Sequence, residues 1–255
     1  MTIRAPTTKN IEKRLQDLGD PKDAAFLQRY FKTGAGEYGA GDTFLGIRVP
    51  ALRAVAKEFR AVSIDEAFVL LRSPFHEARL AALFILVEHF RKGDAAARKR
   101  IYDGYLARTR YVNNWDLVDS SAPTIVGGFL AGRSKAPLTK LAKSKLVWER
   151  RIAMLATLAF IRTGEYAETL RLATLLLHDE HDLIHKAVGW MLREVGQKDR
   201  RVLEHFIDAH AAEMPRTMLR YAIEKLPPGR RKYYLSLRAG STLSRRGGAE
   251  RRPTV

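Results

Sequence analysis

Hydrophobic and polar residues follow a helical period over nearly the whole of this chain. Apolar residues recur three or four positions apart, and short linkers carrying Gly, Pro, Ser or Asp separate the periodic segments. No alternating run of β-branched residues predicts a strand. We therefore expect an all-α protein. The predicted helices lie at about 8–19, 21–31, 50–60, 63–72, 75–91, 94–107, 114–130, 136–143, 147–162, 165–177, 181–195, 199–211, 215–225 and 229–237.

Three of the predicted helices share a local pattern around one basic residue. The three segments are His76-Glu-Ala-Arg79-Leu-Ala-Ala, Trp148-Glu-Arg-Arg151-Ile-Ala-Met and Ile184-His-Lys186-Ala-Val-Gly-Trp190. Aligned on the basic residue, their spacings are 72 (151 − 79) and 35 (186 − 151). The first spacing is about twice the second, so a fourth copy should centre near Trp115. A period of about 36 residues made of two helices is typical of an α-solenoid of HEAT-like repeats.

A solenoid of this kind is curved, and equivalent positions of its repeats line one concave wall. We expect a single domain over residues 1–237. We also expect Arg79, Arg151 and Lys186 to form a row of cations on that wall, in a basic groove of the width of a duplex.

Charge strengthens the expectation of a polyanionic partner. The chain has 45 Lys and Arg against 28 Asp and Glu, a net charge of +17. Residues 238–255 hold five Arg and one Glu, or +4, which leaves +13 on the predicted fold. An excess of this size indicates nucleic acid or an acidic membrane as partner, although a general role in solubility is the alternative. The basic tail, 238–255, has no apolar period, and its composition predicts disorder.

Other classes of protein are excluded by what the sequence lacks. It contains no cysteine, so disulfides, thiolate zinc sites and iron–sulfur clusters are excluded. Residues 1–9 hold no apolar run of the kind found in signal peptides, and no stretch approaches the roughly 18 apolar residues of a membrane span. We expect a cytoplasmic protein without a membrane partner, associated with the nucleoid when it is bound to DNA.

Residues 111–123 form the most unusual stretch of the chain. In a helix, Asp119 lies one turn after Trp115 at the edge of an apolar stripe, where a carboxylate is uncommon. Asp116 falls on the opposite, solvated side. Pro123 cannot donate its backbone bond to the carbonyl of Asp119, so the helix should kink or restart there. We expect this stretch to present Asp119 and Trp115 to a ligand, although Trp115 lies close to its apolar stripe and a place in the core is the alternative for it.

Two further residues are candidates for the same site. Trp190 lies about 120° from the centre of its helix's apolar stripe, so it either packs under a loop or contacts a ligand. Arg151 lies at the edge of its stripe, where the stem can pack and the head can reach solvent. Helical wheels place Asp119 on one side of its stripe and the other two on the opposite side. The sequence alone therefore does not decide whether Asp119, Arg151 and Trp190 lie on the same wall of the solenoid.

Two other motifs favour structural roles. Residues 34–42 are rich in glycine, but no Gly-Lys-Ser/Thr follows and no strand precedes, so we expect a surface loop with Tyr38 and Phe44 tucked beneath it. His181 and His185 have the spacing of metal ligands, but a third ligand is not evident, and solvated histidines at a helix start are the favoured interpretation. We expect no metal.

At these residues the chain resembles the AlkD-like family of DNA alkylation repair enzymes, which are HEAT-like-repeat DNA glycosylases. The resemblance extends over most of residues 25–226. It rests on Trp115-Asp-Leu-Val-Asp119-Ser-Ser-Ala-Pro123, Trp148-Glu-Arg-Arg151-Ile-Ala, Lys186-Ala-Val-Gly-Trp190-Met-Leu-Arg-Glu194, and the segment from Tyr30-Phe-Lys-Thr-Gly34 through Phe44-Leu-Gly-Ile-Arg48-Val-Pro50.

The resemblance implies a monofunctional glycosylase that removes N3- and N7-alkylated purines from duplex DNA in base excision repair. It implies that Asp119 is the catalytic carboxylate, that Trp115 and Trp190 pack on the deoxyribose of the lesion, and that Arg151 lies beside its phosphate. In this family the lesion is understood to stay largely stacked. Four further cations are expected to bind DNA. They are Lys32, Arg48, Arg79 and Lys186.

The chemistry of these residue types agrees with that implication. An N3- or N7-alkylated purine is already cationic and leaves readily, through an oxocarbenium-like sugar. A carboxylate about 4 Å away contributes about 4 kcal/mol at an effective dielectric constant of 20, or roughly a thousandfold in rate. Asp119 can supply this charge and orient water without a cofactor.

We therefore expect a monomeric enzyme limited to cationic lesions, because no convincing general acid for a neutral base is present. The alternatives are a non-catalytic HEAT-repeat protein that binds branched or distorted DNA, and a protein-binding scaffold.

Overall fold

The computed structural model describes residues 6–237, and within that range the chain is helical, with one isolated bridge between Thr43 and Phe75. The α-helices are α1 (Thr8–Gln16), α2 (Pro21–Tyr30), α3 (Val49–Glu58), α4 (Ile64–Leu70), α5 (His76–Lys92), α6 (Ala95–Leu106), α7 (Trp115–Ala122), α8 (Gly128–Leu130), α9 (Ala136–Ala142), α10 (Val147–Ala156), α11 (Leu158–Arg162), α12 (Ala167–Leu175), α13 (Asp182–Lys198), α14 (Arg200–His210), α15 (Arg216–Ala222) and α16 (Pro228–Ser236). The expected all-α fold is confirmed. The basic tail, 238–255, lies outside the described residues.

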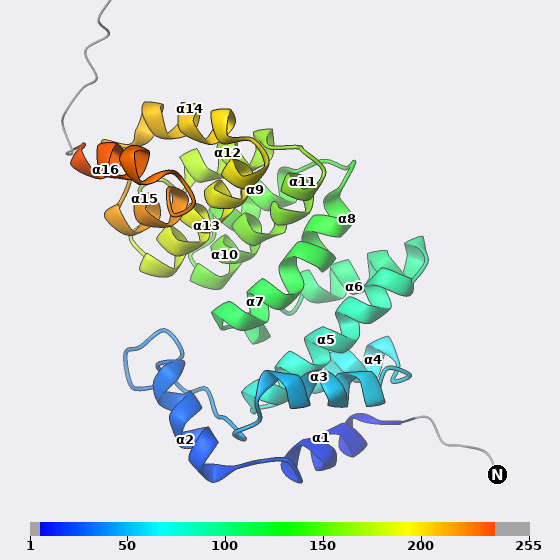
Figure 1. Cartoon of the computed structure of the whole chain (residues 1–255). Helices are drawn as coiled ribbons and strands as arrows, with labels where there is room; N and C mark the ends of the chain where they lie inside the picture. The colour runs from blue at the N-terminus through cyan, green and yellow to red at the C-terminus, as the bar shows by residue number, and fades with distance from the viewer. Residues whose placement is uncertain (1–5, 238–255) are drawn as a thin grey trace, which may run out of the picture.

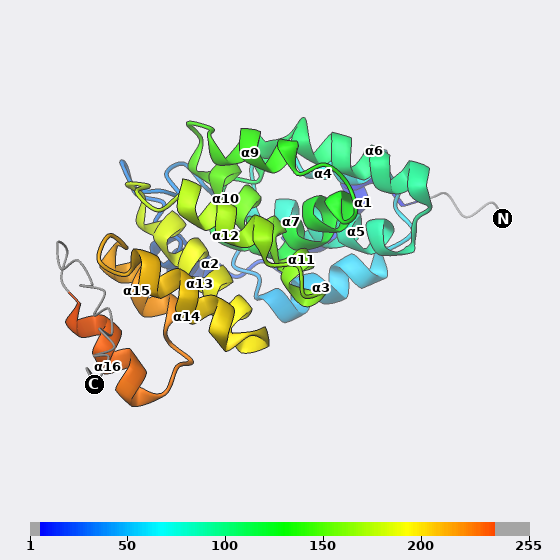
Figure 2. The same ribbon diagram turned by 90° about the horizontal axis from the view of Figure 1, so that it is seen from above.

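Helices of the fold form two layers that follow an arc (Figures 1 and 2). In one layer each helix contacts the next in the order α3, α5, α7, α10, α13 and α15. In the other layer, α4, α6, α9, α12 and α14 pack on the first. Every two-helix unit therefore buries its apolar side against its neighbours, as the repeat period predicts.

One hydrophobic core extends through this array, from Ile11 in α1 to Tyr234 in α16. A small second cluster, Leu27, Phe31 and Phe44, lies beside it and packs against Trp115. Through this cluster, α2 is fixed against the start of α7.

Some helices begin after a residue whose side chain accepts from their unpaired N–H groups. Asp20 accepts from the backbone of Lys22 at 2.7 Å, and Asp94 accepts from Ala97 at 2.8 Å. These caps explain why the predicted starts of α2 and α6 agree closely with the observed ones.

Pro123 interrupts its helix, as expected. A π-helical turn, η2 (Pro123–Gly127), separates α7 from α8. Gly127 allows α10 to cross closely here, since a Cβ at this position would lie 2.1 Å from the carbonyl oxygen of Ala156.

One predicted helix, at 147–162, is divided in the structure. It breaks at Thr157 into α10 and α11, and the Thr157 hydroxyl donates to the carbonyl of Met154 at 2.7 Å. A hydroxyl that bonds its own backbone competes with helix continuation. A short 3-10 turn, η1 (Thr109–Tyr111), was also not predicted.

No helix among residues 6–237 combines the length and the apolar character that crossing a bilayer requires.

Candidate functional site

Trp115 is the first residue of α7 and is held by aromatic neighbours from α2. Its backbone N–H donates to the side chain of the capping residue, Asn114, at 2.8 Å. Its indole stacks on Phe31 with ring centroids 5.2 Å apart and meets Tyr30 edge-on at 6.2 Å. Trp115 is half-buried, so one part of the indole packs and another part stays accessible.

Asp119, one turn later, is paired with Arg151 of α10. The Arg151 guanidinium donates from Nε at 2.9 Å and from Nη2 at 2.7 Å to the two carboxylate oxygens. Its Nη1 donates to the carbonyl oxygen of Leu183 at 2.7 Å. This guanidinium therefore links α7, α10 and the start of α13. These three hydrogen bonds use one N–H of Nη1 and one of Nη2, and they leave the second N–H of each of these nitrogens for another acceptor.

The ion pair lies largely out of solvent. The Asp119 side chain is 17% exposed and that of Arg151 is 6% exposed. Burial raises the pKa of Asp119 above its usual range, and the charge and hydrogen bonds of Arg151 oppose that rise. Arg151 is thus the group that favours the ionised form of this carboxyl.

A cavity of about 460 Å³ lies beside this pair, between α2, α7, α10, α13 and α15. It brings together Trp115, Arg151 and Trp190, three of the four expected catalytic-site residues, and the fourth, Asp119, is bonded to Arg151. Its wall consists of Tyr30, Lys32, Tyr38, Trp115, Arg151, His181, Asp182, Leu183, Lys186, Trp190 and Tyr221.

The structure shows whether Trp190 packs under a loop or faces a cavity. It is half-buried, lines the cavity, and its indole N–H donates to Glu194 at 2.9 Å. The apparent conflict between helical wheels is also resolved. The facing sides of neighbouring helices meet, so Asp119 on α7 and Arg151 on α10 come together from opposite sides of their own stripes.

The expected DNA-binding role of Arg79 is wrong. Arg79 is 5% exposed, its Nη2 is paired with Asp42, and its Nη1 donates to the carbonyls of Ser73 and Pro74 at 3.1 and 3.2 Å. A guanidinium so enclosed is not available to a phosphate. The expected row of cations on one wall therefore does not include Arg79.

Three other expected DNA-binding cations lie at the surface or at the cavity. Lys32 is exposed and lines the cavity. Lys186 also lines it and is paired with Asp182 at 2.7 Å. Arg48 is exposed, pairs with Asp23 and lies over the Phe26 ring at 4.9 Å, at the margin of a neighbouring apolar pocket.

His181 and His185 have local roles at the start of α13. The His181 ring accepts from the backbone N–H of Leu183 at 3.2 Å, and His185 bonds to the carbonyl oxygen of Asp179. Among residues 6–237, no group of three or more His, Cys, Asp or Glu side chains could hold a metal ion.

A buried charge network at α5 was missed by sequence reasoning. The His76 ring bonds Asp42 through Nδ1 and Asp116 through Nε2, both at 2.8 Å. Burial opposes protonation, but the two carboxylates outweigh it and raise the pKa of His76 to about 9. Asp116, expected on a solvated face, is therefore held in this network. Its partner lies 40 positions away in the chain, so no local signal could reveal it.

Glu77, the next residue of α5, explains the motif Phe44-Leu-Gly-Ile. Its buried carboxylate accepts from the backbone N–H groups of Leu45, Gly46 and Ile47 at 2.8 to 3.2 Å. Gly46 has a φ of 88°, a conformation that side chains disfavour. The segment leading into α3 is thus fixed against α5.

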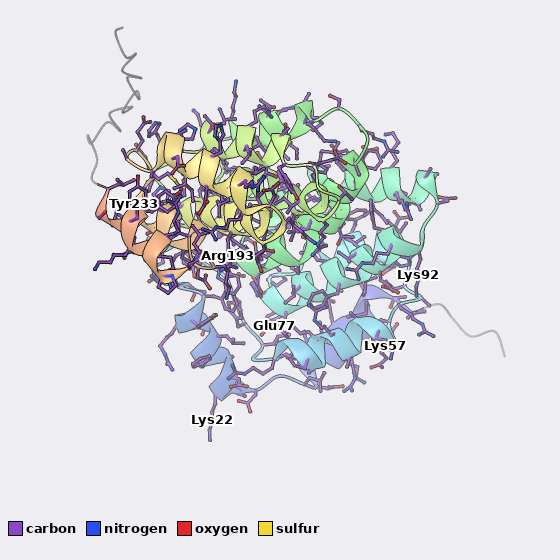
Figure 3. All side chains as sticks on the ribbon, turned by 45° about the horizontal axis from the view of Figure 1, so that its top comes forward. Lys22, Lys57, Glu77, Lys92, Arg193 and Tyr233 are labelled. Atoms are coloured by element: carbon purple, nitrogen blue, oxygen red, sulfur yellow. The ribbon has the colours of Figure 1, made fainter. Side chains whose placement is uncertain are left out.

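A second concave surface, the basic cleft, lies between α3 and α5. Its volume is about 430 Å³, and Ser120, the neighbour of Asp119, lines its edge. Figure 3 shows two of its lysines, Lys57 and Lys92, at the same end of the molecule. Its cations are Arg53, Lys57, Arg60, Arg91 and Lys92. The spacing of the first three, four and then three residues, was a helical-face signal in the sequence.

Comparison with solved structures identifies proteins that share this fold. A solved structure described as a predicted DNA alkylation repair enzyme from Enterococcus faecalis superposes with a TM-score of 0.62 at 17% sequence identity, over 82% of this chain and 97% of that one. A second, smu.31 from Streptococcus mutans UA159, gives 0.48 at 16% identity, over 84% and 95%. The superposition on the Enterococcus faecalis structure shows that this chain shares its helical solenoid fold.

The family model for DNA alkylation repair enzymes matches residues 11–226, and this chain belongs to that family. No curated protein is similar enough in sequence to count as a match. Membership assigns the protein to DNA alkylation repair, with DNA as its partner.

Proposed function

We propose that this protein is a DNA glycosylase that hydrolyses the N-glycosidic bond of cationic N3- and N7-alkylated purines in duplex DNA. The observation that carries the proposal is the Asp119 carboxylate, bound by Arg151 at a cavity walled by Trp115 and Trp190. Family membership supports the repair role, and the side-chain geometry supports this reaction within it.

The reaction needs negative charge beside a sugar that becomes cationic. As the glycosidic bond breaks, its electron pair leaves with the cationic base, which becomes neutral, and positive charge develops on the deoxyribose. The Asp119 carboxylate stabilises this charge, and the faces of Trp115 and Trp190 add a smaller cation–π contribution. Water then attacks the sugar carbon, and Asp119 orients that water and accepts its proton.

Arg151 favours the ionised form of the Asp119 carboxyl and fixes its orientation. Without a cation, burial would favour the protonated acid, which has no charge to offer. With the guanidinium bonded to both oxygens, the carboxyl is ionised and fixed in orientation at neutral pH. Because these residues all come from one chain, we expect a monomer to be active.

The first test is replacement of the carboxylate. Asp119→Asn should abolish most release of 7-methylguanine from methylated genomic DNA, measured by mass spectrometry of the free bases, and should retain affinity for duplex. Loss of one charge of this kind corresponds to a roughly thousandfold fall in rate. Asp17→Asn, at an exposed position, is the matched control and should be fully active. Excision at the wild-type rate by Asp119→Asn would exclude the assignment.

A non-catalytic DNA-binding protein is the second candidate. The net charge of +17 and the basic cleft favour binding to branched or distorted duplex, and neither requires hydrolysis. Absence of base release from methylated DNA by the wild-type protein, together with tighter binding to a four-way junction than to a linear duplex, would select this function instead.

A further inference from the structure

We infer that Tyr38 contacts the damaged nucleotide and acts with Trp115 and Trp190 as an aromatic wall of the same cavity. Tyr38 lies on residues 33–42, the glycine-rich loop that joins α2 to the segment before α3. This inference rests on the proposed function, since it names a further residue that binds the same substrate.

The glycine-rich loop is an ordered series of turns. The N–H of Gly39 donates to the carbonyl of Lys32 at 3.0 Å, and that of Asp42 donates to Gly39 at 3.0 Å. A Cβ at Gly39 would lie 2.5 Å from the carbonyl oxygen of Phe31, so only glycine permits this close approach to the end of α2. The position of the adjacent Tyr38 is therefore fixed by packing of the loop on α2.

The far end of the loop is tied to α7. Asp42 is buried, pairs with Arg79, and bonds His76 at 2.8 Å. The other ring nitrogen of His76 bonds Asp116, the neighbour of Trp115, at 2.8 Å. The loop that carries Tyr38 and the helix that carries Trp115 are consequently connected through one charged network.

The Tyr38 side chain lies in the cavity wall. It is half-buried, and its ring meets Trp148 edge-on with centroids 6.1 Å apart. Burial raises the pKa of Tyr38, and the neighbouring Trp115 and Lys186 oppose that rise. The phenol is therefore neutral at neutral pH and has a proton to donate in a hydrogen bond.

The surrounding groups define the part of the substrate that Tyr38 would contact. Lys32 and Lys186 line the same cavity, and their charges suit a phosphate. The indoles suit the apolar face of a deoxyribose. A phenol among these groups fits the sugar–phosphate of the damaged nucleotide, with its hydroxyl donating to a phosphate oxygen and its ring covering the sugar.

Two duplexes, one undamaged and one with a tetrahydrofuran abasic analogue, provide the test of Tyr38. We expect Tyr38→Phe to bind the abasic duplex about tenfold more weakly, the effect of one hydrogen bond to a charged group, and Tyr38→Ala to bind it more weakly still. Both should bind undamaged duplex within about twofold of wild type. For 7-methylguanine release, KM should rise more than kcat falls. Tyr233→Phe, on helix α16 and outside the lining of the cavity, is the control for loss of a hydroxyl; Figure 3 labels Tyr233.

Two outcomes would overturn the inference. One is wild-type affinity of both Tyr38 variants for the abasic duplex. The other is equal weakening for abasic and undamaged duplex, which would mean that Tyr38 makes no contact specific to the damaged nucleotide. If the wild-type protein releases no base, the proposed function fails, but the comparison of abasic-duplex affinities still decides the role of Tyr38.

Discussion

Asp119 and Arg151 depend on each other for their charge states. Removing two opposite charges from water costs several kcal/mol per ion, and only mutual bonding offsets it. Here the geometry is bidentate, with both distances under 3 Å. This pairing favours the charged form of the carboxyl in a largely dry location, which is where its field acts most strongly on a nearby cation.

Replacing Arg151 should alter the pH dependence of base release. The pKa of Asp119 is already raised by burial, so activity is lost as pH falls through that raised value. In Arg151→Gln, the opposing cation is absent, the pKa rises further, and the acid limb of kcat against pH should move to higher pH. At pH 7 we expect a fall of about a hundredfold. The measurement is single-turnover 7-methylguanine release from pH 5 to 9.

Arg150→Gln is a matched control for this change. Arg150 is the preceding residue of α10 and is ion-paired with Asp179 at 2.7 Å, so its loss also breaks a partly buried pair. Its variant should keep the wild-type acid limb. An acid limb that shifts equally in both variants would contradict the specific role given to Arg151.

At this scale, sequence reasoning identified pairs of residues that are close in the chain and missed partners that are distant in it. The pair Trp115 and Asp119 is one helical turn long, so its spacing was readable. Arg79 was misjudged because Asp42, its partner, lies 37 positions away. Helix starts also correct the repeat alignment, since Asp119, Arg151 and Lys186 each lie four residues after the first residue of their helix (119 − 115, 151 − 147, 186 − 182).

Charged contacts between the glycine-rich loop, α5 and α7 hold these elements in position around the candidate site. Asp42 from the glycine-rich loop, His76 from α5 and Asp116 from α7 meet in one network, and Arg79 completes it. The His76 ring is also stacked on Phe44 at 4.4 Å and near Phe31 at 5.0 Å. The protonated imidazole of α5 thus joins the glycine-rich loop to α7.

Stability should therefore fall as the imidazole loses its proton. The pKa of His76 rises from 6.5 to about 9 in the fold, so its contribution is fully present below about pH 6.5 and is lost as pH rises through about 9. That shift corresponds to about 3 kcal/mol. Urea unfolding of the wild-type protein at intervals from pH 6.5 to 9.5 should show the loss.

The comparison variants isolate this histidine. His76→Gln should be less stable at pH 7 and should lose little further stability across the same range. His205→Gln, at an exposed position of α14, should follow the wild-type curve. A wild-type free energy of unfolding that is flat from pH 6.5 to 9.5 would show that His76 is not protonated in the fold.

Helices were predictable because their determinants are local. Periodic apolar positions lie within a few residues of each boundary, and they placed the limits of α5 (75–91 predicted, His76–Lys92 observed) within one residue, although its N-cap residue, Phe75, has no side-chain acceptor. The break at Thr157 was not predictable, because a hydroxyl can bond its own backbone or point away, and only packing decides which.

Across the whole molecule, two surfaces suit a long anionic ligand. The cavity beside Asp119 and the basic cleft are connected through α7, since Ser120 lines the cleft and the adjacent Asp119 is bonded at the cavity. The overall shape was predictable from the repeat period, because stacking of two-helix units follows from burial alone. The relative positions of the two surfaces required the packing angles between helices, which no spacing in the sequence encodes.

The salt dependence of DNA affinity should show how many phosphate contacts the fold makes and how many the basic tail makes. Removing residues 238–255 subtracts four positive charges from +17. If each of the five arginines of the tail contacts a phosphate, the slope of log affinity against log salt should become shallower by up to about 4.5, and base release at low salt should persist. Fluorescence anisotropy of a labelled duplex between 50 and 300 mM salt measures the slope. Unchanged slope in the truncated protein would show that the tail makes no phosphate contact.

The carboxylate and the guanidinium at the centre of the site belong to consecutive two-helix units, on α7 and on α10. Because the two partners stand on different units, their separation depends on the angle between those units. Under the proposed function, a duplex that alters the curvature of the arch would therefore also alter the distance between Asp119 and Arg151.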